Sequence, residues 1–223
     1  GNSRLRWVCV LPLLSLQDSI DMLPWCKENG AVAVLMRPFE GDRLIQDPYF
    51  YPLYEAMTKL DLPVGMHIGN ANPHIIDTTR QRVGYGAGFW SMSANTAGAC
   101  HAVITSKLPE IFPGLRFGFI EASAQWIPWV FKDIKRRAEG RKLPDNFFET
   151  YRLYVSCYSS TDDIEYIAQY STENVLMTGT DYGHVDMSVE IDALRTLEKN
   201  GKVRPELARK ILYDNPARFY GIQ

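Results

Sequence analysis

The segment Ala31–Gly69, AVAVLMRPFEGDRLIQDPYFYPLYEAMTKLDLPVGMHIG, contains the pattern that decides the fold. Its opening run, Ala31–Met36, is wholly apolar, which predicts a strand buried on both faces. Asp47-Pro48 then precedes a segment of helical spacing at Tyr49–Leu60, and Val64–Ile68 is a second apolar run. A buried strand, a helix and another buried strand in this order are typical of a parallel sheet covered by helices.

The same alternation continues on both sides of this segment. Further strands are predicted at Leu5–Leu13, Arg116–Glu121, Leu153–Tyr158 and Val175–Gly179. Further helices are predicted at Ser15–Asn29, Phe89–Ser106, Gln125–Glu139, Thr161–Tyr170, Val189–Lys199 and Pro205–Tyr213. Gly30 is expected just after the first of these helices, and Pro128 fits the first turn of another. Thr161-Asp162-Asp163 is expected to cap the helix that it opens.

Repeated strand–helix units fit either a doubly wound open sheet or a (β/α)8 barrel. A doubly wound sheet would carry a Gly-rich phosphate loop directly after an early strand, whereas GYGAG at Gly84–Gly88 has no strand immediately before it. We therefore predict an α/β fold, a TIM-like (β/α)8 barrel in one domain over residues 1–223. The pattern contains strands three to eight of such a barrel and lacks the first two.

Composition excludes several classes of protein. The chain has 223 residues, 46% of them hydrophobic and 22% charged, and a net charge of −2. This balance argues against nucleic-acid binding and against disorder, and no apolar run approaches the roughly 20 residues that span a bilayer. The widely spaced cysteines, without a Cys-x-x-Cys pair, indicate free thiols in a reducing compartment. We predict a cytoplasmic protein without a membrane or nucleic-acid partner. The cysteines are Cys9, Cys26, Cys100 and Cys157.

Polar residues follow three of the predicted strands, at the edge where barrel enzymes place their active sites. They are His67, Glu121 and Asp181, and His184 lies three residues beyond the last. Imidazole and carboxylate groups are ligands of catalytic divalent ions, which usually have three protein ligands. Structural roles stay open: a satisfied histidine at 67, an N-cap at 181, and a loop cap or a substrate-orienting group at 184.

Aromatic residues near this edge suit a flat conjugated or aromatic acid, and we identify Phe89, Trp90 and Trp126 as candidate substrate contacts. Arg80 and Arg82 are candidates for pairing with a substrate carboxylate, because the planar guanidinium matches that group. The alternatives are aromatic packing of helices onto the barrel and solvation of the arginines at the surface.

Five stretches, in order, give the chain a resemblance to a known family. They are DPYFYPLYEA (47–56), LPVGMHIG (62–69), FPGLRFGFIEASAQWIPW (112–129), TGTDYGHVD (178–186) and ILYDNPARFYG (211–221). The chain resembles the amidohydrolase-related family that includes aminocarboxymuconate-semialdehyde decarboxylase and the resorcylate-type decarboxylases. The resemblance implies a barrel enzyme that needs a divalent metal ion, with zinc expected and manganese the alternative. It is also compatible with a homo-oligomer, such as a dimer.

The resemblance also implies roles for single residues. His67 matches the family's metal-binding histidine after strand five, and Asp181 matches its metal-binding aspartate after strand eight, which also transfers protons. Glu121 stands where decarboxylase members carry a catalytic histidine and where other members carry Glu, often before Gly-Gly. Because Ala122-Ser123 replaces those glycines, Glu121 is assigned either to proton transfer or to orienting the substrate or a ligand.

The family's first strand supplies a His-x-His pair of metal ligands, and this sequence has none. Its histidines are His67, His74, His101 and His184, and no two are separated by one residue. Matched to the family, the chain begins at strand three. We expect that the natural protein has residues before Gly1, because a barrel without two strands leaves unpaired edges. The alternative is a truncated member that binds metal poorly.

Three functions follow from these expectations. The first is a carboxy-lyase for a small aromatic or conjugated carboxylic acid, in which Asp181 manages the proton that replaces carbon dioxide. The second is a hydrolase of an amide, ester, lactone or activated C–C bond, in which Asp181 deprotonates a metal-bound water. The third is a non-catalytic barrel subunit that lacks a complete metal site.

Overall fold

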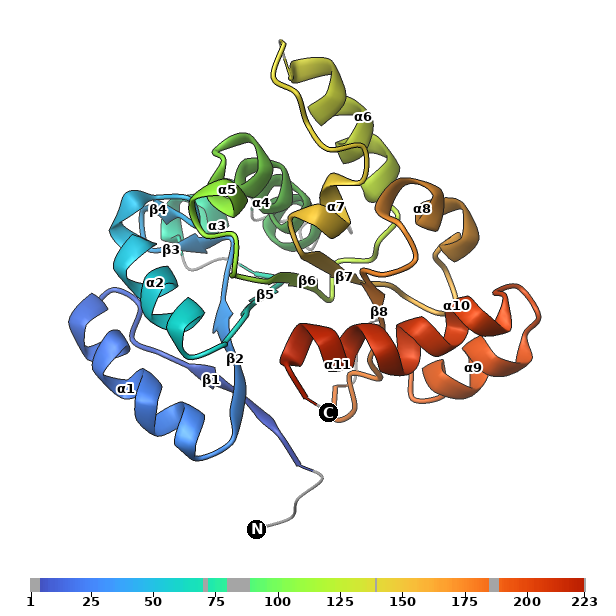
Figure 1. Cartoon of the computed structure of the whole chain (residues 1–223), viewed down its shortest axis with the longest axis horizontal. Helices are drawn as coiled ribbons and strands as arrows, with labels where there is room; N and C mark the ends of the chain where they lie inside the picture. The colour runs from blue at the N-terminus through green and yellow to red at the C-terminus, as the bar shows by residue number, and fades with distance from the viewer. Residues whose placement is uncertain (1–4, 70–71, 80–88, 139, 185–188, 223) are drawn as a thin grey trace.

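The computed structural model describes residues 5–69, 72–79, 89–138, 140–184 and 189–222. Its centre is a parallel sheet of six strands in the order β1-β2-β5-β6-β7-β8 (Figure 1). The strands are β1 (Trp7–Val10), β2 (Ala31–Met36), β5 (Val64–His67), β6 (Phe117–Ile120), β7 (Leu153–Ser156) and β8 (Leu176–Met177). Neighbours in the sheet follow the order of the chain, so each connection steps to the next position, as in a barrel. In the described part of the chain, β1 and β8 are the edges of this sheet.

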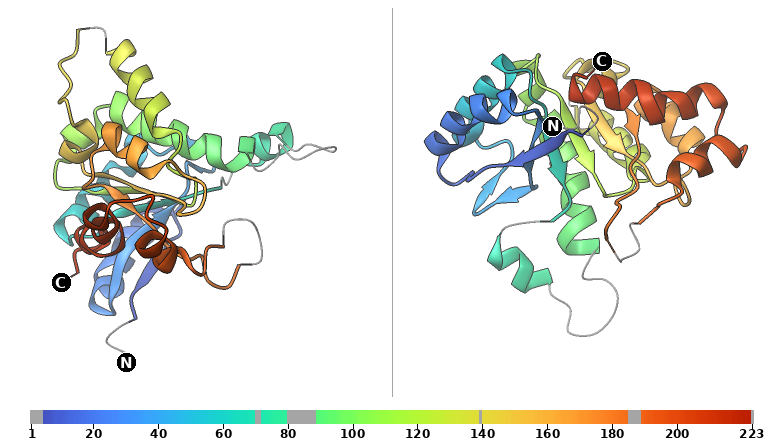
Figure 2. Two further views of the ribbon diagram at one scale, coloured as in Figure 1. Left: turned by 90° about the vertical axis from the view of Figure 1, so that its right-hand side faces the viewer. Right: turned by 90° about the horizontal axis from the view of Figure 1, so that it is seen from below.

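Helices connect the strands and form an arc around the sheet (Figures 1 and 2). The longer ones are α1 (Leu16–Glu28), α2 (Tyr51–Lys59), α4 (Ala94–Thr105), α6 (Ile127–Arg137) and α8 (Ile164–Ser171). The shorter ones are α3 (Pro73–Thr79), α5 (Leu108–Ile111), α7 (Phe147–Thr150), α9 (Ala193–Lys199), α10 (Pro205–Arg209) and α11 (Asn215–Tyr220). A 3₁₀ turn, η1 (Pro48–Phe50), and two π-helical turns, η2 (Phe89–Ser93) and η3 (Lys210–Asp214), extend α2, α4 and α11. A small hairpin of β3 (Phe39–Glu40) and β4 (Arg43–Leu44) follows β2.

The two faces of the sheet have different partners, because side chains alternate along a strand. Phe117 and Phe119 of β6 are fully buried and contact aromatic rings of α2 and of the segment before α6. Gly118, between them, faces the other way, and a Cβ there would lie 2.4 Å from the ring of Phe219 in α11. Tyr154 of β7, paired with Gly118, also contacts Phe219. Helix α11 therefore packs on the face opposite to the outer helices.

Most predicted elements are present, and several are shorter than predicted. The run Leu5–Leu13 contains a strand only at Trp7–Val10, because the chain turns after it, where the Leu13 N–H donates to the Leu11 carbonyl at 2.9 Å. Gly30 follows α1 with φ +91°, as a residue after a helix end often does, and Pro128 lies in the first turn of α6. Both of these expectations are confirmed.

One helix start was predicted incorrectly, and one predicted cap has the expected position but not the expected hydrogen bond. The helix expected from Val189 begins at Ala193. Glu190 lies outside it, because the Glu190 carboxylate accepts hydrogen bonds from the backbone N–H groups of Ser159 and Ser160. Thr161-Asp162-Asp163 was expected to cap α8. Asp163 stands at the N-cap position without a side-chain cap hydrogen bond, and the Asp162 carboxylate accepts hydrogen bonds from residues outside that helix. In both places a tertiary contact replaces the local one.

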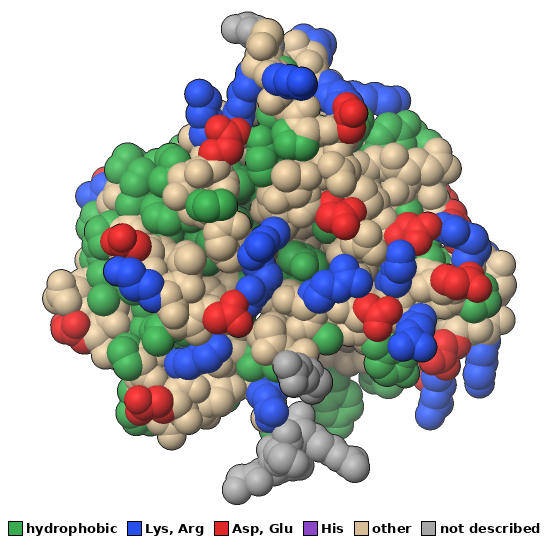
Figure 3. Space-filling model, viewed as in Figure 1, with side chains coloured by type: hydrophobic (Ala, Val, Ile, Leu, Met, Phe, Trp, Pro, Cys, Tyr) green, Lys and Arg blue, Asp and Glu red, His purple; other side chains and the backbone are tan. Residues whose placement is uncertain are grey.

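Most charged side chains lie at the surface of the molecule, and the cysteines lie inside it. On the face shown in Figure 3, basic and acidic side chains are interspersed. All four cysteines are free and buried, and burial raises the pKa of the Cys157 thiol. Among the described residues, no helix is both long enough and apolar enough to cross a membrane.

Candidate metal centre

The carboxyl ends of β5, β6 and β8 meet at one edge of the sheet and bring three predicted site residues together. His67 is the last residue of β5, Glu121 directly follows β6, and Asp181 lies shortly after β8. All three line one cavity of about 110 Å³. The other described lining residues are Ile120, Ser156, Cys157, Tyr158 and Gly179. Three side chains that are far apart in the sequence therefore share one enclosed space.

One nitrogen of the His67 imidazole lies near a backbone carbonyl oxygen, and the other lies near a carboxylate oxygen. Its Nδ1 lies 3.1 Å from the Ile68 carbonyl oxygen, which can only accept, so a hydrogen bond there needs the proton on Nδ1. Its Nε2 lies 2.6 Å from Oε2 of Glu121. In the neutral imidazole, this places a nitrogen lone pair against a carboxylate oxygen. A positive charge, either a proton or a metal ion, is needed to make this contact favourable.

Glu121 is held rigidly although it lies in a loop. Its side chain is only 8% exposed, and its backbone has φ +66°, a left-handed conformation that is costly for a residue with a Cβ. The backbone N–H donates to Oγ of Ser156 at 2.7 Å, and the Tyr158 hydroxyl donates to the Glu121 carbonyl at 3.0 Å. Neighbouring β7 thus fixes the direction of the carboxylate.

Oε2 of Glu121 is buried and has no hydrogen-bond partner among the described residues, despite its short distance to His67. The two observations agree if the atoms are close but not aligned as donor and acceptor. A buried carboxylate oxygen needs compensation by a hydrogen bond, a positive charge or an ion. Either a proton on Nε2 of His67 or a cation beside Oε2 would supply this compensation.

Asp181 and His184 complete the group. Asp181 also has a left-handed backbone, with φ +48°, and its Oδ2 lies 2.9 Å from Nδ1 of His184. The same nitrogen is 3.9 Å from Oε1 of Glu121. One donor atom from each of these three residues lies within 4.8 Å of the others. A carboxylate, a second carboxylate and an imidazole fit the preferences of zinc and similar divalent ions, so the residues present suit a metal.

A half-buried acid anchors the loop that carries Glu121. Asp162, at the start of the α8 region, accepts hydrogen bonds from the Ser123 hydroxyl at 2.5 Å and from the backbone N–H of Ala124 at 2.8 Å. The backbone N–H of Tyr158 donates to the same carboxylate at 2.9 Å. Burial raises the pKa of Asp162, and these hydrogen bonds oppose that rise. Asp162 therefore ties the β6–α6 loop to the β7–α8 loop.

The predicted aromatic contacts lie elsewhere. Phe89, Trp90 and Trp126 line a larger cavity between α4 and α6, which shares no described lining residue with the cavity of Glu121. A contact of these rings with a molecule bound beside Glu121 stays a prediction. Arg80 and Arg82 lie outside the described residues, so their role also stays a prediction.

Sequence reasoning missed the residues that β7 contributes. Ser156 and Tyr158 lie at the carboxyl end of an apolar strand, LYVS, which is the same signal that identified His67 and Glu121. Applying that rule to every strand would have found them. The contact of Asp162 with the β6–α6 loop leaves no local signal, because its partners are distant in the sequence.

Known proteins are similar to this chain in family and in fold. A family profile described as amidohydrolase matches residues 4–222. No curated protein sequence gives a match. An amidohydrolase from Mycobacterium avium subsp. paratuberculosis K-10 superposes with a TM-score of 0.79 at 17% identity, over 97% of this chain and 57% of that chain.

Two decarboxylases are also similar in structure. One is the 2,6-dihydroxybenzoate decarboxylase from Rhizobium, with a TM-score of 0.74 and 19% identity over 96% of this chain and 70% of that chain. The other is a 5-carboxyvanillate decarboxylase from Novosphingobium aromaticivorans with bound manganese, with a TM-score of 0.72 and 14% identity over 96% of this chain and 64% of that chain. At such identities the likeness shows the fold, and it confirms the predicted α/β barrel class. The chain spans 57% to 70% of the length of these three structures.

Proposed function

Because this chain belongs to the amidohydrolase family, we propose that it is a metal-dependent carboxy-lyase that acts on a small aromatic or conjugated carboxylic acid. The observation that carries the proposal is the convergence of His67, Glu121 and Asp181 on one cavity at the carboxyl edge of the sheet. Two similar structures are decarboxylases of aromatic acids, which supports this class of substrate.

A divalent ion would be held by Glu121, Asp181 and His184, with His67 beside Glu121. When bound, such an ion polarises a substrate oxygen and offsets the negative charge of the acid. We propose zinc as the ion, with manganese as the alternative, which is supported by the manganese in a similar decarboxylase.

In the proposed reaction, the residues of the chain handle the proton. Decarboxylation breaks the bond between a ring carbon and the carboxylate, releases carbon dioxide, and leaves an electron pair that a proton must take. Asp181 in its protonated form donates that proton to the ring carbon and is then reprotonated from solvent. Nδ1 of His184, 2.9 Å from Oδ2, orients the Asp181 carboxyl group. The rigid Glu121 directs the substrate from the opposite wall.

Hydrolysis is the second candidate, and the residue at position 121 favours it. The decarboxylases of the resembled family carry a histidine there, whereas this chain has a carboxylate that points into the cavity lining. A carboxylate in this place can take a proton from a water molecule that attacks an amide, ester, lactone or activated C–C bond.

We also propose a cytoplasmic location and a homo-oligomer such as a dimer.

Two measurements test these proposals. The purified chain is dialysed against zinc or manganese, and its metal content is measured by mass spectrometry. It is then incubated with 2,6-dihydroxybenzoate and related aromatic acids while carbon dioxide is monitored. Bound metal with carbon dioxide release supports the lyase, and cleavage with added water supports the hydrolase. A metal content below about a tenth of an equivalent at micromolar free metal contradicts both.

A further inference from the structure

A second cavity lies between α4 and α6, outside the proposed metal centre, with a volume of about 490 Å³. Small-molecule sites typically have volumes of 300 to 1,000 Å³ and mainly apolar walls. The described residues that line it are Phe89, Trp90, Ser93, Ala94, Ala97, Gly98, His101, Ala122, Ser123, Gln125, Trp126, Trp129, Val130 and Asp133. No residue of this set lines the cavity of Glu121. The space is therefore separate and of the right size for a small ligand.

The shape of the cavity follows from the spacing of residues on its two helices. Ala94, Ala97 and Gly98 recur at helical spacing along α4 and form a wall with almost no side chains. A Cβ added at Gly98 would have no atom within 4 Å, so this wall borders open space. Trp126 and Trp129 recur in the same way on the opposite wall. A smooth wall facing indole rings makes a flat slot.

Further aromatic rings form the rim. Phe89 and Trp90 contact each other edge to face, with ring centroids 5.7 Å apart, and both are exposed. Trp129 is 70% exposed, which is unusual for so large a ring. Aromatic faces attract other flat rings by stacking and by edge-to-face contact. The rim and the slot therefore select a planar aromatic ring.

The polar groups of the cavity select an uncharged ligand. Asp133 is the one acidic residue among the described lining residues. It is already paired with Arg136 and Arg137 at 2.6 and 2.5 Å and is contacted by Nε2 of His101 at 3.1 Å. No lysine or arginine is among the described lining residues, so a carboxylate would have no cation there. The indole N–H of Trp126 is buried without an acceptor among the described residues. A ligand oxygen would satisfy this donor after a small rotation of the ring.

From these observations we propose that the slot between α4 and α6 binds an uncharged planar aromatic molecule that carries an oxygen acceptor. The ligand stacks on Trp126 and Trp129 against the smooth wall of α4, and its oxygen accepts from the Trp126 N–H. This chemistry differs from that of the metal cavity, whose acid and histidine residues suit an anion bound through a cation. The slot is thus a second binding site and does not depend on the proposed reaction.

The test is isothermal titration calorimetry of the whole chain with 2-naphthol. Saturable binding is expected in the original chain, and Gly98→Leu should weaken it by at least about tenfold by filling the slot. Leucine also favours a helix more than glycine does, so this variant should fold. The matched control, Thr105→Leu, adds a leucine at an exposed position of α4 outside the slot and should bind normally. Trp126→Phe should weaken binding by about threefold, because it keeps a ring but removes the N–H.

Each other outcome overturns part or all of the proposal. No saturation up to about 1 mM 2-naphthol contradicts it, and so does equal binding by Gly98→Leu. Unchanged binding by Trp126→Phe overturns the contact with the oxygen. If Gly98→Leu instead dissociates a dimer seen by light scattering, the slot is covered by a second copy and the proposal is wrong. His67→Ala should leave 2-naphthol binding unchanged, so failure of the metal proposal is recognised separately.

Discussion

At the scale of single residues, the two acids of the metal centre share an uncommon backbone. Glu121 and Asp181 both have positive φ angles, and both lie where a strand has just ended. Strained positions persist when their surroundings hold them, and they occur often at functional sites. The contacts of Ser156 and Tyr158 with Glu121 are such a support. Neighbouring residues therefore hold the strained backbone of Glu121 in place beside His67.

Asp181→Asn tests the proton-transfer role. The change keeps the size of the side chain and removes its ability to donate and recover a proton, so we expect turnover to fall by at least about 100-fold. The circular dichroism spectrum and the unfolding midpoint should remain near those of the original chain. Full activity of this variant would remove Asp181 from the mechanism.

His67→Ala tests the metal centre directly. Loss of the imidazole beside Glu121 should weaken metal binding by more than about tenfold, measured as metal retained after dialysis. The control is His101→Ala, because His101 lies on α4 and pairs with Asp133 outside the Glu121 cavity. Equal metal retention in the two variants would contradict the assignment of His67.

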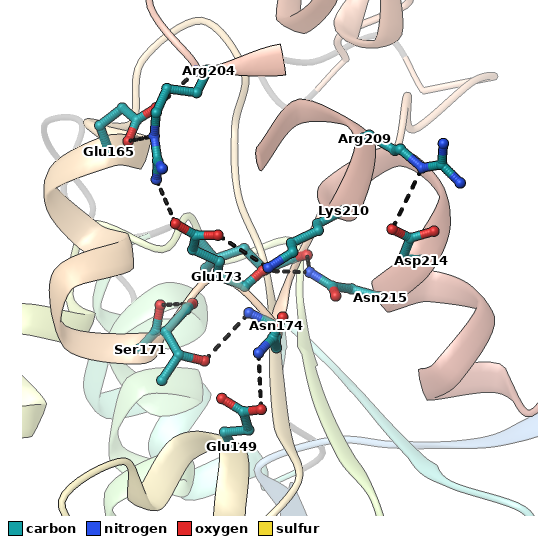
Figure 4. Close-up of polar contacts among 12 residues, drawn as sticks. Glu149, Glu165, Ser171, Glu173, Asn174, Arg204, Arg209, Lys210, Asp214 and Asn215 are labelled. Carbon is teal, nitrogen blue, oxygen red and sulfur yellow. Dashed lines mark hydrogen bonds and ion pairs between the residues drawn. The ribbon is translucent and has the colours of Figure 1, made fainter. Parts of the chain in front are cut away.

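At the scale of elements, ion pairs attach the C-terminal helices to the end of α8. Figure 4 shows Glu173, just after α8, between Arg204 and Lys210. Its carboxylate oxygens lie 2.5 Å from the guanidinium of Arg204 and 3.0 Å from Nζ of Lys210. The side-chain amide of Asn215 donates to the backbone carbonyls of Glu173 and Leu176 at 2.9 and 2.7 Å. These contacts fix α10 and η3 beside β8, which leads to Asp181.

The pH dependence of stability follows from Glu173. Hydrogen bonds from Arg204 and then Lys210 lower its pKa below the ordinary value of 4.5. A lowered pKa stabilises the folded chain above the unfolded pKa, and this contribution is lost as the pH falls through the folded value. Glu173→Gln should therefore reduce the free energy of unfolding at pH 7 by less than about 1 kcal/mol for each of the two ion pairs that Glu173 makes.

The loss should shrink as the pH falls below the ordinary value of 4.5, because the carboxylate is protonated first in the unfolded chain and then, at its lowered pKa, in the folded chain. Urea unfolding at pH 7 and at pH 3.5 measures the difference. Glu198→Gln, at an exposed position of α9, is the matched control and should change neither value. A difference of the same size at both pH values would show that the charge of Glu173 does not act in this way.

At the scale of the whole molecule, α11 closes the face of the sheet that carries the metal centre. Gly118 and Ile120 share this face of β6 because they are two residues apart, and Ile120 lines the metal cavity. Phe219 is fully buried against Gly118 and Tyr154 on the same face. The C-terminal helix thus forms the floor beneath the site, although it contributes no described lining residue to it.

Gly118→Ala tests this packing. Its new Cβ would overlap the Phe219 ring, so the variant should lose about 1 to 3 kcal/mol of unfolding free energy. Phe219→Leu alone should also be destabilising, because it leaves a void. The double variant should lose less than the sum of the two, since leucine makes room for the methyl group. Strictly additive losses in urea unfolding would contradict direct contact.

The sequence by itself determined the alternation of parallel strands and helices, the residues that end β5 and β6, and the family. These properties depend on local burial patterns: an apolar run excludes water wherever it lies, and a polar residue at its carboxyl end faces the active edge of the sheet. For this reason His67, Glu121 and Asp181 were identified as candidates without coordinates.

Only the tertiary structure decided how these residues meet. The contact between His67 and Glu121, the approach of His184, and the supports from Ser156 and Tyr158 depend on strand order and register, which no local pattern encodes. The separation of the aromatic slot from the metal cavity has the same origin. Trp126 follows Glu121 closely in sequence, but the two residues line different cavities. Sequence distance limits how far apart two side chains can lie, while packing determines which of them share a space.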